Sequence, residues 1–112
     1  MTISDWQRQV DNWIKEIGVR YFDEKTNALI LTEEIGEFAR IIAREYAEQS
    51  WKKPLTKEDV KQQLTDEIAD IIWVTTCLAN QLDIDLSKAL KANIEKKTSR
   101  DKERHQQNTK LK

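Results

Sequence analysis

Residues that interrupt helices are scarce in this chain. Its 112 residues include 2 glycines, Gly18 and Gly36, and 1 proline, Pro54. A fold of many short strands needs frequent turns, and turns favour these two residue types. The sequence therefore predicts a few long helices rather than a sandwich or barrel of strands. The length suits one domain with a single core.

Apolar residues recur at helical spacing in four segments. The predicted helices run from about Asp5 to Ile17, from Asp23 to Gln49, from Thr56 to about Leu82, and from Asp85 or Ser87 to about Arg104. Ser4 with Gln7, and Thr56 with Asp59, have the spacing of residues that cap helix N-termini. The expected fold is all-α: a four-helix bundle with two long central helices in residues 1–104, followed by a frayed polar tail at 105–112.

The composition argues against several classes of protein. Lys and Arg number 19 and Asp and Glu number 20, so the overall charge indicates neither a nucleic-acid partner nor a membrane surface. The single cysteine, Cys77, excludes an internal disulfide, and we expect it to be a small buried residue. No secretion signal or membrane-spanning run is recognisable, so we expect a soluble cytoplasmic protein.

Acidic residues interrupt the apolar faces of both long helices. Glu34 and Glu37 lie between Ile30 and Ile41 on one stripe of the second helix, and Glu33 lies at the edge of that stripe. On the third helix, Glu67 falls in the middle of an otherwise apolar stripe, and Asp70 follows at i+3; the apolar members are Val60, Leu64, Ile71, Val74 and Leu78.

Carboxylates in such positions need a cation. An uncompensated buried carboxylate costs several kcal/mol, and two like charges about 4 Å apart repel by about 4 kcal/mol at an effective dielectric of 20. Arg40, Arg44 and Lys97 are candidates for a purely structural ion-pair network. The alternative is a divalent metal, and an all-oxygen ligand set favours Mg²⁺, or Mn²⁺, over zinc. A di-iron site would need Glu-x-x-His pairs, but the one histidine, His105, lies in the tail.

The fourth helix supplies positive charge. Its apolar stripe of Leu86 and Leu90 continues as Asn93, Lys97 and Arg100 on the same face. An amide, a lysine and an arginine beside an acidic metal site are what binding of a polyphosphate requires. We therefore interpret Asn93, Lys97 and Arg100 as phosphate-binding residues.

Aromatic residues offer candidates for binding a base. Trp6 and Trp13 lie on the apolar stripe of the first helix, so we expect them in the core. Tyr21 and Phe22 precede the second helix and are the better candidates for a base pocket. Trp73 lies off the main stripe of its helix, which indicates a second buried surface, and self-association would supply one.

Three segments in order resemble the MazG-like nucleotide pyrophosphohydrolases of the all-α NTP pyrophosphatase superfamily. They are Asn-Ala-Leu-Ile-Leu-Thr-Glu-Glu-Ile-Gly-Glu at 27–37, Asp-Glu-Ile-Ala-Asp at 66–70, and Asn93-x-x-x-Lys97-x-x-Arg100. The resemblance extends from Trp13 to Arg104. It implies Mg²⁺-dependent hydrolysis of nucleoside or deoxynucleoside triphosphates between the α and β phosphates, which yields a monophosphate and pyrophosphate. It also implies a dimer or a dimer of dimers.

The resemblance also implies roles for individual residues. The implied metal ligands are Glu34, Glu37, Glu67 and Asp70. Asn93, Lys97 and Arg100 would hold the phosphates, with Lys97 and Arg100 stabilising charge on the leaving pyrophosphate, and Asn27 matches a polar position near the nucleotide. Glu33 is near enough to support the ligands or to act as the base for the attacking water.

Other functions stay open at this stage. A sibling activity of the superfamily, on dUTP or phosphoribosyl-ATP, would use nearly the same acids. A non-enzymatic helical module that binds a partner through the basic segment from Lys88 to Lys112 would need no Mg²⁺, and its affinity for nucleic acid would fall steeply with salt. The expected biological role of the enzyme is the removal of modified or surplus nucleotides.

Overall fold

The computed structural model describes residues 1–112 as four α-helices and a terminal 3-10 turn, without strands. The elements are α1 (Ile3–Glu16), α2 (Glu24–Tyr46), α3 (Lys57–Gln81), α4 (Leu86–Gln106) and η1 (Thr109–Leu111). The all-α class and the number of helices are therefore confirmed. None of these helices combines the length and the apolar character needed to cross a lipid bilayer.

The helix starts follow local sequence signals with one exception. Asp23, Thr56 and Asp85 are the N-caps of α2, α3 and α4, as predicted. The α1 cap is Thr2, whose hydroxyl accepts from Asp5 N–H at 3.0 Å while the Asp5 carboxylate accepts from Thr2 N–H at 2.9 Å. The predicted capping pair of Ser4 and Gln7 is therefore wrong: the pair is Thr2 and Asp5, two residues earlier. The Asp5 carboxylate also interacts favourably with the positive end of the helix dipole, which Gln7 would not do.

Gln7 does not cap α1 because its side chain makes tertiary hydrogen bonds instead. Its side-chain amide donates to Asn80 Oδ1 at 3.0 Å and to Ile84 O at 2.9 Å, and its Oε1 accepts from Leu86 N–H at 2.8 Å. Gln7 therefore connects α1 to the end of α3 and the start of α4 and is not available to cap its own helix.

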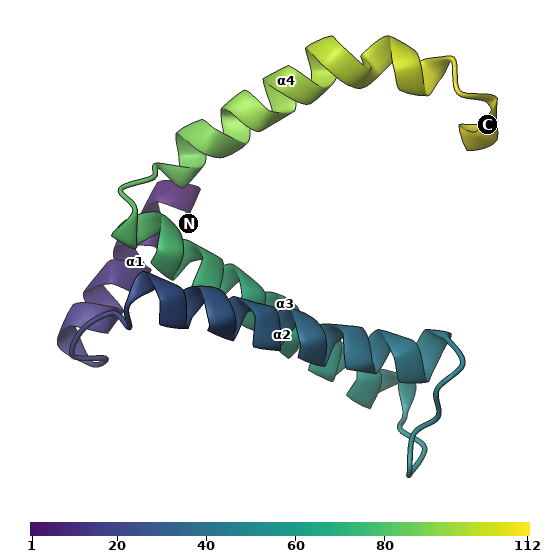
Figure 1. Cartoon of the computed structure of the whole chain (residues 1–112), viewed down its shortest axis with the longest axis horizontal. Coiled ribbons are helices and arrows are strands. Elements are labelled where there is room, and N and C mark those ends of the chain that lie inside the picture. Colours follow the sequence, from purple (N-terminus) through teal and green to yellow (C-terminus); the bar gives the residue numbers. More distant parts are fainter.

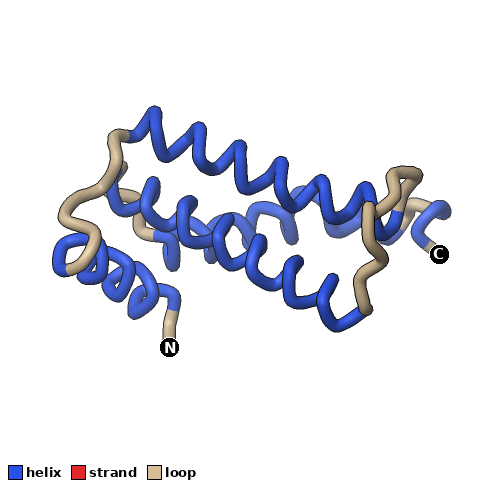
Figure 2. The backbone as a smooth tube through the Cα atoms, turned by 90° about the horizontal axis from the view of Figure 1, so that it is seen from below, coloured by secondary structure: helices blue, strands red, loops and turns tan.

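The long hairpin of α2 and α3 dominates the molecule (Figure 1). The two helices run antiparallel side by side, and the loop that contains Pro54 joins them at one end (Figure 2). α2 ends at Tyr46, three residues before the predicted end at Gln49, and Ala47 takes an extended backbone conformation. The chain then folds back so that Trp51 Nε1–H donates to Glu45 Oε2 at 3.0 Å.

α1 packs across the other end of this hairpin. Val10 and Ile14 of α1 form the core with Cys77 of α3, which confirms that the cysteine is buried. The indole of Trp73 meets the rings of Trp6 and Trp13 edge to face, with ring centroids 6.0 and 5.2 Å apart. The second surface of Trp73 is therefore α1 of the same chain, and the predicted explanation by self-association is wrong for this residue.

The connectors that follow α1 and α3 each contain a residue in the left-handed backbone region. Val19, after α1, has φ 72°, and Asp83, between α3 and α4, has φ 57°. Aspartate tolerates this conformation, whereas a β-branched residue is strained in it. Val19 therefore costs folding free energy that the docking of the α1–α2 connector must offset.

α4 leaves the other three helices. It packs against α1 near its start and then projects away from the hairpin (Figure 1). The four helices therefore do not close a bundle within one chain, contrary to the prediction. Residues 102–112 are exposed; 105 and 106 belong to α4, and η1 folds back on that helix.

The resulting chain is open for its size. Its radius of gyration is 17.9 Å, compared with about 13 Å for a compact domain of this length. Its accessible surface is 9136 Å², compared with about 6,400 Å² for a folded monomer of this mass. The exposed surface includes Ile35, Ile68 and Ile72 on the hairpin and Leu90 and Ile94 on α4. A compact monomer would bury much of this apolar surface.

Candidate metal and nucleotide site

Three carboxylates meet where α2 faces α3. One oxygen each from Glu34, Glu67 and Asp70 lies within 4.8 Å of the others. The Oε2 atoms of Glu34 and Glu67 are buried and have no hydrogen-bond partner. Unpaired buried carboxylate oxygens are costly, so the cluster is incomplete as it stands.

The pKa of Glu67 reflects the cost of burying these carboxylates together. Its pKa rises from 4.5 to about 7 because burial disfavours the charged form, and the nearby Glu34 and Glu37 carboxylates raise it further. Glu37 therefore lies close enough to belong to the same electrostatic group. A divalent cation would reverse the effect, since it favours ionised ligands.

No basic side chain neutralises the cluster. The ion pairs of the chain lie elsewhere, on α1 and near the end of α4: Arg8–Asp5, Lys15–Asp11, Arg100–Asp101 and Arg104–Asp101. Arg40 and Arg44 form no ion pair, so the structural network considered from the sequence is not formed. The all-oxygen donor set and its two orphaned atoms fit a hard divalent cation.

The outer flank of α2 continues from this cluster. Glu33 and Glu37 are exposed there and line an open cavity of about 420 Å³ together with Gly36 and Arg40. Glu33 thus lies beside the cluster rather than in it, where a water molecule is accessible to it. This position is compatible with either role considered for Glu33.

An aromatic pocket lies farther along the hairpin. It encloses about 230 Å³ between α1, the α1–α2 connector, α2 and α3. Its lining includes Trp13, Tyr21, Phe22, Asn27, Trp73 and Cys77. Tyr21 and Phe22, which we predicted as base-binding residues, both line this pocket. Trp13, predicted chiefly as a core residue, and Trp73, which was not a candidate, line it as well. The sequence did contain a signal for Trp73, because it follows Asp70 by one helical turn and so lies next to the acidic cluster.

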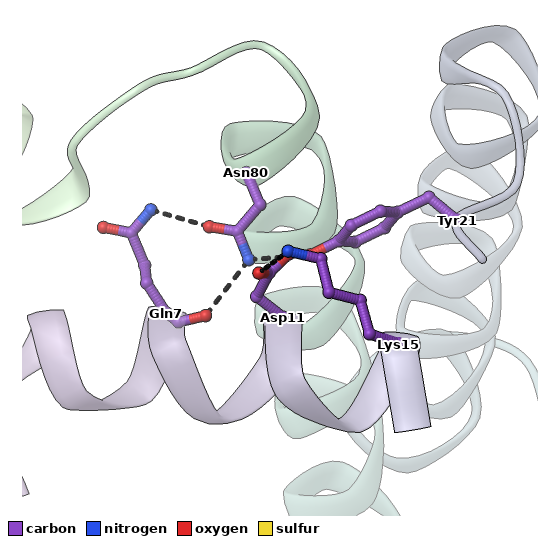
Figure 3. A network of polar contacts seen from close by, with 5 residues as sticks. All are labelled: Gln7, Asp11, Lys15, Tyr21 and Asn80. Atoms are coloured by element: carbon purple, nitrogen blue, oxygen red, sulfur yellow. Dashed lines mark hydrogen bonds and ion pairs between the residues drawn. The ribbon is translucent and has the colours of Figure 1, made fainter. Parts of the chain in front are cut away.

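Hydrogen bonds fix the orientation of Tyr21 (Figure 3). Its hydroxyl donates to Asp11 Oδ1 at 2.7 Å and accepts from Asn80 Nδ2 at 3.0 Å. Lys15 Nζ donates to the other Asp11 oxygen at 2.6 Å. Burial and the bond to Asp11 raise the pKa of Tyr21 to about 12, so the hydroxyl stays a donor at neutral pH. Only the ring of Tyr21 is left to contact a ligand.

Asn27 anchors the other side of the pocket. It is 5% exposed, and its side-chain amide donates to Gln81 Oε1 at 2.7 Å and, at 3.4 Å, to Phe22 O. Gln81 Nε2 also donates to Phe22 O at 2.5 Å. Asn27 therefore holds the connector against α3 while it lines the pocket.

The basic residues of α4 lie apart from the acids. Asn93, Lys97 and Arg100 are exposed on α4, and this helix projects away from the hairpin (Figure 1). Arg100 pairs with Asp101, with both nitrogen–oxygen distances 3.1 Å, and this pairing raises the pKa of Arg100 and lowers that of Asp101. Within one chain, the structure does not bring these three residues to the acidic cluster.

Comparisons with known proteins agree on one family. Residues 22–105 match the family model of the MazG nucleotide pyrophosphohydrolase domain. The uncharacterised protein YpjD of Bacillus subtilis strain 168 is 38% identical over 103 residues, which cover 92% of this chain and 89% of that protein.

Two solved structures share the fold. One is the crystal structure of the candidate pyrophosphatase YpjD from Bacillus subtilis, with a TM-score of 0.73, 34% identity, and coverage of 86% of this chain and 94% of that chain. The other is the Bacillus-conserved MazG protein, described as a nucleotide pyrophosphohydrolase, with a TM-score of 0.72, 32% identity, and coverage of 92% and 96%.

Proposed function

Because this chain belongs to the MazG nucleotide pyrophosphohydrolase family, we propose that it hydrolyses nucleoside or deoxynucleoside triphosphates between the α and β phosphates in the presence of Mg²⁺. The products would be a nucleoside monophosphate and pyrophosphate, and Mn²⁺ would substitute for Mg²⁺. The observation that carries the proposal is the pair of buried, unpartnered oxygens of Glu34 and Glu67. They need positive charge, and the chain brings no basic side chain to them.

Glu34, Glu67 and Asp70 would hold the ion, with Glu37 as a fourth ligand. A divalent ion bound there supplies positive charge to the phosphates and makes a water molecule more acidic. Glu33 lies on the flank of the same cavity as Glu37, where it can orient that water or accept its proton. Because these carboxylates come from two helices, they would fix the position of the ion and, through it, that of the reacting phosphates.

The aromatic pocket would hold the base. Its lining residue Val74 follows Asp70 by one turn of α3, so pocket and acids are neighbours along the hairpin. The rings of Trp13, Tyr21 and Phe22 offer faces on which a base can stack, which any base can do. The pocket therefore supports a nucleotide as the substrate and leaves the base open.

A second copy of the chain would complete the site. The exposed apolar residues of α4 and of the hairpin, and the excess surface of the monomer, support a homo-oligomer, a dimer or a tetramer. In such an assembly α4 of one copy can lie along the hairpin of another and bring Asn93, Lys97 and Arg100 to the phosphates. The cytoplasmic location and a role in removing unwanted nucleotides remain predictions.

The test is pyrophosphate release from a panel of NTPs and dNTPs, including dUTP and phosphoribosyl-ATP, with Mg²⁺ and with EDTA. We expect Mg²⁺-dependent release that is lost in Glu67→Gln and kept in Asp66→Asn, a matched change at an exposed neighbouring carboxylate. Full turnover in Glu67→Gln would contradict the ligand assignment. Preference for dUTP or phosphoribosyl-ATP would favour a sibling activity.

A further inference from the structure

Three features follow one another along α2. Asn27 lines the aromatic pocket, Glu34 belongs to the acidic cluster, and Arg40 lines the open cavity beyond it. At 1.5 Å per residue, Asn27 and Glu34 are about 10 Å apart along the axis, and Glu34 and Arg40 about 9 Å. Along the helix axis the order is therefore aromatic pocket, acidic cluster and arginine, over a length that suits an extended nucleoside triphosphate.

Two arginines extend the acidic flank of α2. Glu33, Glu37, Arg40 and Arg44 are spaced i, i+4, i+7 and i+11, which places them on one side of the helix. Glu37 and Arg40 have the spacing of a helical ion pair, yet neither arginine pairs with a carboxylate within 4.0 Å. No carboxylate of the chain therefore neutralises either guanidinium.

Arg44 also has an unmet hydrogen-bonding requirement. Its Nη1 is buried without an acceptor, and its guanidinium lies over the Trp51 ring at 5.8 Å from the centroid. Trp51 in turn is held by Glu45. Stacking on Trp51 thus holds the Arg44 guanidinium at this end of α2. Its Nη1 remains a hydrogen-bond donor without an acceptor.

Gly36 lines the cavity beside Arg40. Glycine in the interior of a helix costs about 1 kcal/mol relative to alanine. A Cβ at Gly36 would meet nothing within 4 Å, so packing within the chain does not require glycine there. Glu33, Gly36, Glu37 and Arg40 line the same cavity, so the absent side chain leaves space next to both an acid and a base.

We propose that Arg40, with Arg44 one turn farther on, binds the leaving pyrophosphate, while the base occupies the aromatic pocket. This inference rests on the proposed function and deepens it, because it fixes the direction of the substrate along the hairpin. A guanidinium binds phosphate oxygens through two parallel hydrogen bonds. Hydrolysis beside the acidic cluster, in which water adds to the α phosphorus and the bond to the β-phosphate breaks, would then leave the monophosphate on the Asn27 side and pyrophosphate on the Arg40 side.

The two products distinguish this arrangement from others. We would measure binding of inorganic pyrophosphate and of a nucleoside monophosphate by calorimetry with Mg²⁺, for the wild type, Arg40→Gln and Arg8→Gln. Arg8 is the matched control, since it lies on α1 and pairs with Asp5. We expect Arg40→Gln to weaken pyrophosphate binding at least about tenfold and monophosphate binding by less than about twofold. Arg8→Gln should change neither.

Unchanged pyrophosphate binding in Arg40→Gln, or equal weakening of both products, would overturn the inference. Equal weakening would mean that Arg40 acts on the whole cluster, for example by orienting Glu37. Absence of pyrophosphate binding by the wild type would overturn it as well. The proposed function fails separately, if the wild type releases no pyrophosphate from any nucleotide of the panel.

Discussion

Glu34 of α2 and Glu67 of α3 place carboxylate oxygens within 4.8 Å of each other, and each keeps its Oε2 buried without a hydrogen-bond partner. Two acids so arranged destabilise the fold on their own and become favourable when a cation joins them. The pairing of Glu34 with Glu67 thus links the stability of the fold to the binding of a cation, and both can be measured.

Glu67→Gln is expected to stabilise the metal-free protein, because it removes a buried charge that faces other acids. The gain should be on the order of 1 kcal/mol after solvent screening. The same variant should lose the stabilisation that Mg²⁺ or Mn²⁺ gives the wild type, since a ligand has been removed. Thermal denaturation with EDTA and with each cation measures both effects. Asp66→Asn is the control. If Glu67→Gln were less stable than the wild type in EDTA, the Glu67 carboxylate would not be destabilising the metal-free fold.

The pKa of Glu67 predicts how stability depends on pH. It is 4.5 without the fold and about 7 within it, so the folded chain holds this proton more tightly than the unfolded chain. The associated stabilisation is complete below pH 4.5 and is lost as the pH rises through about 7. With EDTA present, urea denaturation should show the wild type losing stability over this range relative to Glu67→Gln. Parallel curves for the two proteins would show that another group titrates.

The network around Tyr21 should stabilise the fold at neutral pH. Asp11→Asn removes a charged acceptor of bonds from Lys15 and Tyr21, and we expect a loss of about 1–2 kcal/mol in the free energy of unfolding. Those bonds lower the pKa of Asp11 below 3.8, so its contribution is present above that pH and is lost as the pH falls through the lowered pKa. The difference between wild type and variant should therefore shrink in strong acid. Glu16→Gln, an exposed change on the same helix, should show neither effect.

The strained backbone at Val19 predicts a stabilising substitution. Its φ of 72° and 83% exposure mean that the side chain contributes strain and little packing. Val19→Gly should raise the free energy of unfolding by about 1 kcal/mol. Gly18→Ala should act in the opposite direction, because a Cβ there would lie 3.2 Å from Ile14 O and from the Trp13 ring. Denaturant titration of the two variants checks both signs.

The projecting helix predicts association of copies. Ile94 of α4 is 67% exposed and Leu90 is 47% exposed on the same face. If this face is covered in an oligomer, Ile94→Asp should shift the molar mass measured by light scattering towards that of a monomer. Ala92→Asp makes the same charge change about 200° around the helix and should leave the mass unchanged. A monomeric wild type would contradict the proposed assembly.

Local sequence signals determined most of the secondary structure. Asp23, Thr56 and Asp85 cap the helices that their spacing predicts, because a cap depends only on neighbours within one turn. The periodicity also places Glu34 and Glu37 on one stripe between isoleucines, and Glu67 on an otherwise apolar stripe, since the angle around a helix axis follows from position alone.

Tertiary structure decided how those faces meet. Periodicity says nothing of where a helix points after a turn, and the turn at Asp83 directs α4, with Lys97 and Arg100, away from the hairpin. The partner of Trp73 and the unpaired state of Arg40 likewise depend on contacts between segments distant in sequence. The sequence by itself determined which side chains share a face; only the packing of whole helices decided which of those faces come together.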